Sequence, residues 1–144
     1  MISEVPIIDA SNRLVHPSQA RLKYDKYVAY ANEPLCNLSC FHPEFGTYHV
    51  EGVDIFECLC KLRQILHERH NVYILCAGSR IDTYSSGAAR NMSGGRVLFS
   101  YILGKFPTRD DEVRIFDLTT PNKVGSPEEQ LRYHMDWLKS MNFI

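Results

Sequence analysis

The stretch that decides the fold is residues 54–76, which read DIFECLCKLRQILHERHNVYILC. Its first part, from about Asp54 to His70, predicts a helix with one apolar face, because apolar residues recur at spacings of three and four: Ile55, Leu59, Leu62 and Leu66. Asp54 and Glu57 resemble a capping box at its start. Residues 72–76 are a continuous apolar run, and they predict a central strand that is covered on both faces.

Three more elements are predicted on the C-terminal side of this stretch. A second helix is expected to start near residues 93–96, to run through Val97, Leu98, Tyr101 and Ile102, and to end at Gly104. Residues 112–118 alternate polar and apolar, as a strand with one buried face does. A last helix has a strong start signal in Ser126, Pro127 and Glu129. Its apolar stripe is predicted to be Leu131, Met135, Leu138 and Met141, broadened by Tyr133 and Trp137.

The first 50 residues are broken by four prolines and predict short strands only, at Ile7-Ile8, at residues 27–30 and at residues 47–50. The second half then alternates strands and helices. The expected fold is therefore α+β or α/β, with a single-layer mixed sheet packed by about three helices. At 144 residues, one domain spanning 1–144 is expected.

Composition excludes several classes of function. The formal net charge of −1 gives no electrostatic signature of membrane-surface or direct nucleic-acid binding. No apolar run approaches the roughly 18 residues of a membrane span, and the N-terminus does not resemble a secretory signal. The five cysteines are an odd number in such a chain, which favours a reducing, cytoplasmic location without a disulfide framework.

The segment from Cys76 to Arg96 is the main candidate for a ligand site. It contains four of the eight glycines and three arginines, and it follows the apolar run at 72–76. A glycine-rich turn that enters a helix presents free N–H groups, and arginines add bidentate contacts to phosphate or carboxylate. The hypothetical ligand-binding residues are Ser79, Arg80, Asp82, Tyr84, Ser86, Arg90 and Asp117. The alternative is an ordered structural loop in which Arg80 pairs with Asp82, or Arg90 with Asp117, and the absence of a specific phosphate motif favours it.

Metal and nucleophile sites have weaker signals. Cys36, Cys40, His42 and His49 offer four zinc-ligand types, but their spacing matches no common pattern. Cys76 ends an apolar run before a glycine, where a buried structural thiol is commoner than a reactive one. The sequence therefore predicts no metal, no cofactor and no catalytic residues.

Residues 52–118 resemble a group of small uncharacterised bacterial proteins. The shared pattern is Gly52-Val53-Asp54-x-Phe56-Glu57-x-Leu59, Leu75-Cys76-x-Gly78-Ser79-Arg80, Asp82-x-Tyr84-x-Ser86-Gly87, Arg90-x-Met92-x-Gly94 and Ile115-Phe116-Asp117. Proteins of this type resemble the immunity proteins of contact-dependent inhibition systems, which neutralise toxin domains. The resemblance implies a cognate toxin domain as the partner.

The sequence thus favours a non-enzymatic binding protein, with a small-ligand or nucleotide-binding protein or an enzyme that uses the Gly78–Arg96 loop as the alternative. Clustered carboxylates suit recognition of a basic partner surface. The hypothetical partner-binding residues are Asp110, Asp111, Glu112, Glu128 and Glu129. A structural module that forms a homo-oligomer is a third interpretation.

Overall fold

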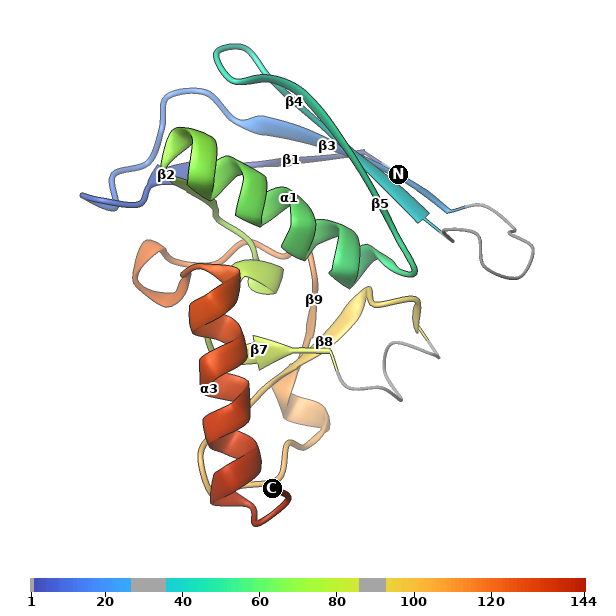
Figure 1. Ribbon diagram of the computed structural model, residues 1–144, viewed down its shortest axis with the longest axis vertical. Helices are drawn as coiled ribbons and strands as arrows, with labels where there is room; N and C mark the ends of the chain where they lie inside the picture. Colours follow the sequence, from blue (N-terminus) through green and yellow to red (C-terminus); the bar gives the residue numbers. More distant parts are fainter. Residues whose placement is uncertain (1, 27–35, 86–92) are drawn as a thin grey trace.

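Helix α1, Ile55–His70, packs on one face of a four-stranded antiparallel sheet, in which the strands are ordered β1-β3-β4-β5 (Figure 1). The strands are β1 (Ile2–Val5), β3 (Ala20–Lys26), β4 (Cys36–His42) and β5 (Gly46–Gly52). This computed structural model describes residues 2–26, 36–85 and 93–144. The strand predicted at residues 47–50 is confirmed within β5, whereas residues 27–30 lie outside the described residues.

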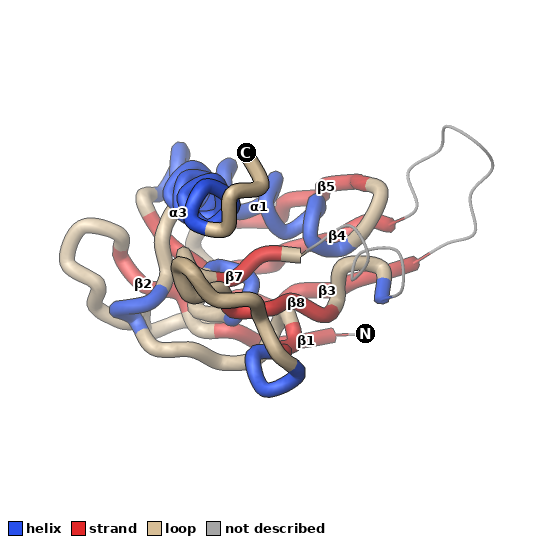
Figure 2. Tube along the Cα trace, turned by 90° about the horizontal axis from the view of Figure 1, so that it is seen from below, coloured by secondary structure: helices blue, strands red, loops and turns tan. Residues whose placement is uncertain are grey.

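Two smaller antiparallel sheets complete the described fold. The first pairs β2 (Ile7–Asp9) with β6 (Val72–Ile74), and the second joins β7 (Thr83–Tyr84), β8 (Val97–Ser100) and β9 (Glu112–Arg114). Helix α3, Pro127–Ser140, packs against β7 in the lower half of Figure 1. Seen from below, α3 lies in front of α1, and β1 lies at the opposite edge of the molecule (Figure 2).

The helix, the N-cap and the apolar face predicted for α1 are confirmed, whereas the resemblance to a capping box is met only in part. Asp54 is the N-cap, and its carboxylate accepts a hydrogen bond from the Glu57 backbone N–H at 2.8 Å. The Glu57 carboxylate in turn accepts from the Val53 N–H at 2.9 Å. The predicted apolar face is buried against β4 and β5, where it meets inward-pointing side chains such as Leu38 and Cys40. Burial of this aliphatic stripe is the main contribution of α1 to the core.

The sheet arrangement corrects the predicted architecture. The fold is mixed α+β, but the described strands form three antiparallel sheets and not one mixed sheet. β6 pairs only with β2 over three residues, so the run at 72–76 is a strand but not the centre of a large sheet. The apolar run is buried because Ile74, Leu75 and Cys76 meet loops and α1, which an apolar pattern alone does not distinguish from a central strand.

The predicted helix from residues 93–96 to Gly104 is wrong. Its core, Val97–Ser100, is β8, which pairs with β7 on one side and β9 on the other. Gly94 and Gly95 have positive φ values of 67° and 83° and make a tight turn just before it. The β-branched and aromatic residues of this segment suit a pleated surface, and the two flanking strands supply the ladder that overrides the helical spacing. The expectation of about three helices therefore fails in the described part of the chain, which holds α1 and α3.

The start of α3 is confirmed, and its buried face agrees with the predicted one at Trp137 but not at Leu131 and Met135. Ser126 and Glu129 form the predicted capping box, with hydrogen bonds of 3.1 Å in both directions. The fully buried residues of α3 are Gln130 and Trp137, whereas Leu131 and Met135 of the predicted stripe are 48% and 41% exposed. The helix thus turns a polar and aromatic side inward, and it leaves aliphatic side chains in solvent.

Two further observations concern the helices and the cysteines. No helix among the described residues is long and apolar enough to cross a membrane. All five cysteines lie in the described ranges, and none of them is joined to another in a disulfide.

Candidate functional site

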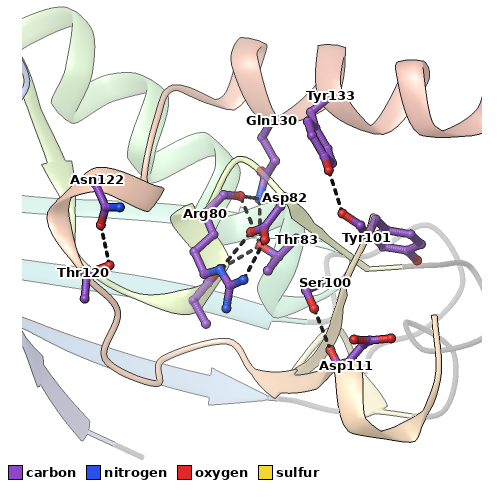
Figure 3. Close-up of polar contacts among 11 residues, drawn as sticks. Arg80, Asp82, Thr83, Ser100, Tyr101, Asp111, Thr120, Asn122, Gln130 and Tyr133 are labelled. Atoms are coloured by element: carbon purple, nitrogen blue, oxygen red, sulfur yellow. Dashed lines mark hydrogen bonds and ion pairs between the residues drawn. The ribbon is translucent and has the colours of Figure 1, made fainter. Parts of the chain in front are cut away.

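The described part of the predicted ligand loop follows β6 along the chain. Its residues Ala77–Ser79 form a buried 3₁₀ turn. Arg80 and Asp82 form a two-pronged ion pair, with Nε–Oδ1 and Nη2–Oδ2 distances of 2.8 and 2.7 Å (Figure 3). The predicted pairing of Arg80 with Asp82 is therefore confirmed. The Arg80 guanidinium has its charge neutralised inside the loop, which leaves it less available to an outside anion.

Other predicted members of the ligand set are also engaged within the chain. Ser79 is fully buried, and its hydroxyl lies 3.6 Å from Cys76 Sγ. The Tyr84 ring stacks on His134 at a centroid distance of 4.1 Å. The Asp117 carboxylate accepts from the Arg114 N–H at 3.2 Å, and the Asp117 carbonyl accepts from the Ala77 N–H at 2.7 Å. The loop and Asp117 are therefore neighbours.

The remaining two residues of the predicted ligand set, Ser86 and Arg90, lie outside the described residues, as does any pairing of Arg90 with Asp117. The hypothesis of a ligand site in the Gly78–Arg96 loop stays a prediction.

A buried arginine, Arg63, forms hydrogen bonds with the backbone of this loop. Arg63 of α1 is only 3% exposed. Its Nη1 donates to Gly78 O at 3.1 Å and to Gln130 Oε1 at 2.7 Å. Its Nη2 donates to Gly125 O at 2.9 Å and to Ser79 O at 3.4 Å. Burial lowers the pKa of Arg63 from its ordinary value. Within the described residues no carboxylate contacts this guanidinium, so backbone carbonyls and one amide oxygen compensate the buried charge.

Gln130 completes this buried network from α3. Its Nε2 donates to the carbonyls of Gly78 and Arg80, both at 2.9 Å (Figure 3). Gly78 lies so close to its neighbours that a Cβ there would stand 2.5 Å from Leu59 Cδ2 and 2.7 Å from Ile115 Cγ1. Glycine is needed at this position for close packing, which is a structural reason for one of the loop's glycines. The network ties α1, the loop and α3 together.

The predicted partner-binding carboxylates fall into two groups. Asp110 and Asp111 lie in a short 3₁₀ turn, and the exposed Glu112 begins β9. Glu128 and Glu129 lie in the first turn of α3, where Glu128 pairs with Arg132 at 3.1 Å and Glu129 serves the capping box. Asp110 and Asp111 instead border a groove beside Phe106, whose ring packs against Trp137 in the last part of α3. The two groups therefore lie beside different parts of α3, one in its first turn and the other near Trp137.

The considered zinc ligands do not converge. Cys36, Cys40 and His42 stand an even number of residues apart on β4, and all three are buried. His49 is exposed on β5 and pairs with Ser39 across the β4–β5 ladder. Across the described ranges, no group of three or more His, Cys, Asp or Glu side chains is placed to hold a metal ion. Burial raises the pKa of Cys40 to about 11 and that of Cys58 to about 12, and it also raises the pKa of Cys76. These thiols are protonated, poorly nucleophilic core groups.

The structure contains a pocket that the sequence analysis missed. It has a volume of about 500 Å³ and lies between the inward side of α3, the β7–β8 strands and the loop at 101–107. Aromatic and apolar side chains dominate its lining: Tyr84, Ser85, Phe99, Tyr101, Phe106, Pro107, His134, Trp137, Leu138 and Phe143. We refer to this set as the aromatic pocket. Its volume falls within the range of about 300–1,000 Å³ that is typical of ligand pockets.

The walls of the aromatic pocket are held by hydrogen bonds and ring contacts. Trp137 Nε1 donates to Lys105 O at 2.9 Å, and Tyr133 Oη donates to Tyr101 O at 2.8 Å (Figure 3). The Tyr101 and Trp137 rings pack edge to face at 4.6 Å. At its rim, Phe106 and Phe143 are 62% and 51% exposed. The pocket therefore has a rigid floor and an apolar, solvent-exposed rim.

Exposed aliphatic side chains extend this rim along α3. Leu131, Met135 and Leu138 stand at positions i, i+4 and i+7, so they share one face of the helix, and Leu138 also lines the aromatic pocket. Ile102 and Leu103 are exposed as well, and their loop is tied to the end of α3 by a hydrogen bond from Gly104 N–H to Ser140 Oγ at 2.8 Å. We call the exposed members of this region the α3 surface: Ile102, Leu103, Phe106, Leu131, Met135 and Phe143.

The pocket brings together aromatic residues from three separate parts of the chain, which is why spacing arguments did not find it. One local signal was present: His134 and Tyr133 stand three and four residues before Trp137, which are the spacings of a helix face. Comparison with known proteins adds no assignment, because neither a scan against protein-family models nor a search of curated proteins gave a match.

Proposed function

We propose that the protein works by binding a partner protein, and that it is an immunity protein whose partner is a toxin domain. The observation that carries the proposal is the α3 surface. Helix α3 buries its polar and aromatic side inside the molecule. Its aliphatic side is exposed to solvent, as are Phe106 and Phe143. Large exposed apolar side chains gathered in one region mark interaction sites on folded proteins.

The composition of the α3 surface suits a protein–protein interface. Interface cores are enriched in aromatic residues and methionine, and the residues with the largest energetic effect sit in well-packed pockets near the centre. Here the exposed Phe106 and Phe143 line the aromatic pocket, and the exposed Met135 follows the pocket residue His134 on α3. A stable complex buries about 800 Å² on each partner. Several large apolar side chains of α3, of the pocket rim and of the 102–106 loop could contribute to that buried area.

Acidic residues beside this surface favour a basic partner. Asp110 and Asp111 border the groove next to Phe106, and Glu112 follows them in β9. Carboxylates at an interface rim steer association with a positively charged partner and disfavour acidic ones. Toxin domains that act on nucleic acid need basic active sites, so this charge pattern supports an immunity function that blocks such a domain.

The test is co-expression with a candidate toxin domain that is encoded by a neighbouring gene. We expect the protein to restore growth of cells that produce the toxin domain, and to form a stoichiometric complex with it in native mass spectrometry. Phe106→Ala and Phe143→Ala are each expected to weaken the complex about tenfold, since a buried aromatic contact contributes more than about 1 kcal/mol.

Phe41→Ala is the matched control, because Phe41 is also an exposed aromatic residue but lies on β4, away from α3. It is expected to bind as the unmodified protein does. The proposal is wrong if the protein neither binds nor neutralises the toxin domain. If binding occurs but only Phe41→Ala weakens it, the interface is the sheet and not the α3 surface.

A further inference from the structure

The described lining of the aromatic pocket is uncharged. Among the residues that the structure describes, no Asp, Glu, Lys or Arg side chain lines it, and its polar groups are Tyr and Ser hydroxyls and the His134 imidazole. Burial lowers the pKa of His134, so this ring is neutral at neutral pH. Its Nδ1 is buried and has no hydrogen-bond partner in the part of the chain that the structure describes. An anionic or cationic group would lose its hydration inside the pocket without finding a counter-charge.

The aromatic rings of the pocket are also preorganised to bind a flat group. Tyr84 stacks on His134 within 9° of parallel, and His134 lies within 20° of parallel to Trp137. Hydrogen bonds from the Trp137 and Tyr133 side chains to backbone carbonyls fix these elements. An inserted aromatic ring would meet ring faces and edges that need no reordering, which lowers the entropic cost of binding.

A second, acidic groove adjoins the pocket. It shares Phe106 and Pro107 with the pocket and is also bordered by Asp110 and Asp111. The Asp111 carboxylate caps its own turn by accepting from the Thr108 N–H at 2.8 Å. The Asp110 carboxylate forms no hydrogen bond or ion pair with the described residues. Lys105 is the basic residue among the described ones that border this groove, so the three charged side chains there sum to −1.

From this arrangement we infer that the partner inserts one uncharged aromatic side chain into the aromatic pocket and places an adjacent Arg or Lys against Asp110 in the acidic groove. The inference rests on the proposed function and adds the chemistry of the contact. An aromatic side chain matches the uncharged, ring-lined interior. A neighbouring cation matches the acidic groove that shares the Phe106 and Pro107 wall.

Short peptides test this pairing directly, with the full-length protein as the receptor. The probes are acetyl-Arg-Phe-Arg-amide, its charge-reversed form acetyl-Glu-Phe-Glu-amide, and acetyl-Arg-Ala-Arg-amide. Trp137 is the single tryptophan of the chain and lies in the pocket, so its fluorescence reports occupancy, and phenylalanine does not interfere with that signal. Saturable change with the first peptide is expected. The charge-reversed peptide should bind at least about threefold more weakly, and the alanine peptide at least about tenfold more weakly.

Two variants locate the contacts. Asp110→Asn should remove most of the difference between the Arg-Phe-Arg and Glu-Phe-Glu peptides, whereas Asp25→Asn, an exposed carboxylate on β3, should leave it unchanged. Phe143→Ala should weaken binding of both phenylalanine peptides, and Phe41→Ala should not. The inference is overturned if no peptide changes the Trp137 signal, if the alanine peptide binds as well as the phenylalanine peptide, or if charge reversal strengthens binding.

The two proposals fail separately. If the peptides behave as expected but no complex with the toxin domain forms, the immunity function is wrong and the pocket chemistry stands. If the complex forms and the peptides do not bind, the function stands and the pocket does not take an aromatic side chain.

Discussion

Helices α1 and α3 both carry an aliphatic stripe in their sequences, yet they use it in opposite ways. α1 buries its stripe completely against the four-stranded sheet, and its lysine and most of its other polar groups remain outside. α3 buries Gln130 and Trp137 instead and leaves Leu131 and Met135 exposed. The aliphatic stripe of α1 is thus part of the core, whereas the aliphatic stripe of α3 is part of the protein surface. An amphipathic stripe indicates that a helix face needs cover, but the cover need not come from the same chain.

The two helices meet at the Arg63–Gln130 contact, and breaking it should have the largest effect. Arg63→Ala removes the donor to four acceptors and leaves buried carbonyls and a cavity. We expect a loss of about 4 kcal/mol in the free energy of unfolding, measured by denaturant titration. Lys61→Ala, on the exposed side of the same helix, should change it by less than about 0.5 kcal/mol.

Arg63→Lys keeps the positive charge but has fewer, differently arranged donors, and it should fall between the unmodified protein and Arg63→Ala. An Arg63→Ala protein as stable as the unmodified one would show that the buried network does not hold the helices together.

Leucine-to-alanine substitutions compare the two stripes directly. Leu59→Ala in α1 removes a fully buried side chain and should cost about 3 kcal/mol. Leu131→Ala in α3 removes a half-exposed side chain and should change stability by less than about 0.5 kcal/mol. Equal losses would mean that the α3 stripe is part of the core in solution. The same pair of variants, measured for partner binding, should give the reverse order.

The Arg80–Asp82 pair tests the alternative interpretation of the loop. Because this pair is partly exposed, Arg80→Ala should cost about 1 kcal/mol or less in stability. Isothermal titration with inorganic phosphate is expected to give no binding to either the unmodified protein or the variant. Saturable phosphate binding that is lost in Arg80→Ala would instead support an anion site in the Gly78–Arg96 loop.

A change of pH tests two histidines, the buried His42 and the half-buried His134, one in each half of the molecule. Burial lowers the pKa of His42 and of His134. His42 packs between His16 and Phe45, with Glu44 and His70 nearby, and its Nδ1 accepts two backbone N–H bonds. A group whose folded pKa lies below its unfolded value of about 6.5 binds fewer protons when folded. Its stabilising contribution is therefore present above about pH 6.5 and is lost as the pH falls further.

Unfolding midpoints measured from about pH 7.5 to about pH 5 should fall with acidification. His134→Phe retains a ring against Tyr84 and removes the titrating group, so this variant should lose less stability over the same range. Identical pH dependence in the two proteins would show that His134 does not contribute.

The sequence was most informative where the determinants are local. The caps at Asp54 and Ser126, the stripe of α1 and the Arg80–Asp82 pair all depend on residues within a few positions of one another, and all are confirmed. Val97–Ser100 was assigned to the wrong element because its state depends on two partner strands that its own spacing does not reveal. The sequence predicts the burial of Trp137 but not that of Gln130, because Gln130 is bonded inside by Arg63 and the Gly78 carbonyl, which lie far away in sequence.

The buried guanidinium of Arg63 also has a consequence for the order of events in folding. Its acceptors at Gly125 and Gln130 lie 62 and 67 residues further along the chain. During synthesis, α1 therefore emerges well before the groups that compensate its charge, and the Arg63 head must stay hydrated until the last helix arrives. Closing contacts of such long sequence separation is slow. The docking of α3 is thus the step that buries the Arg63 guanidinium. Before that step the guanidinium is an exposed cation, and after it the group is buried and hydrogen-bonded.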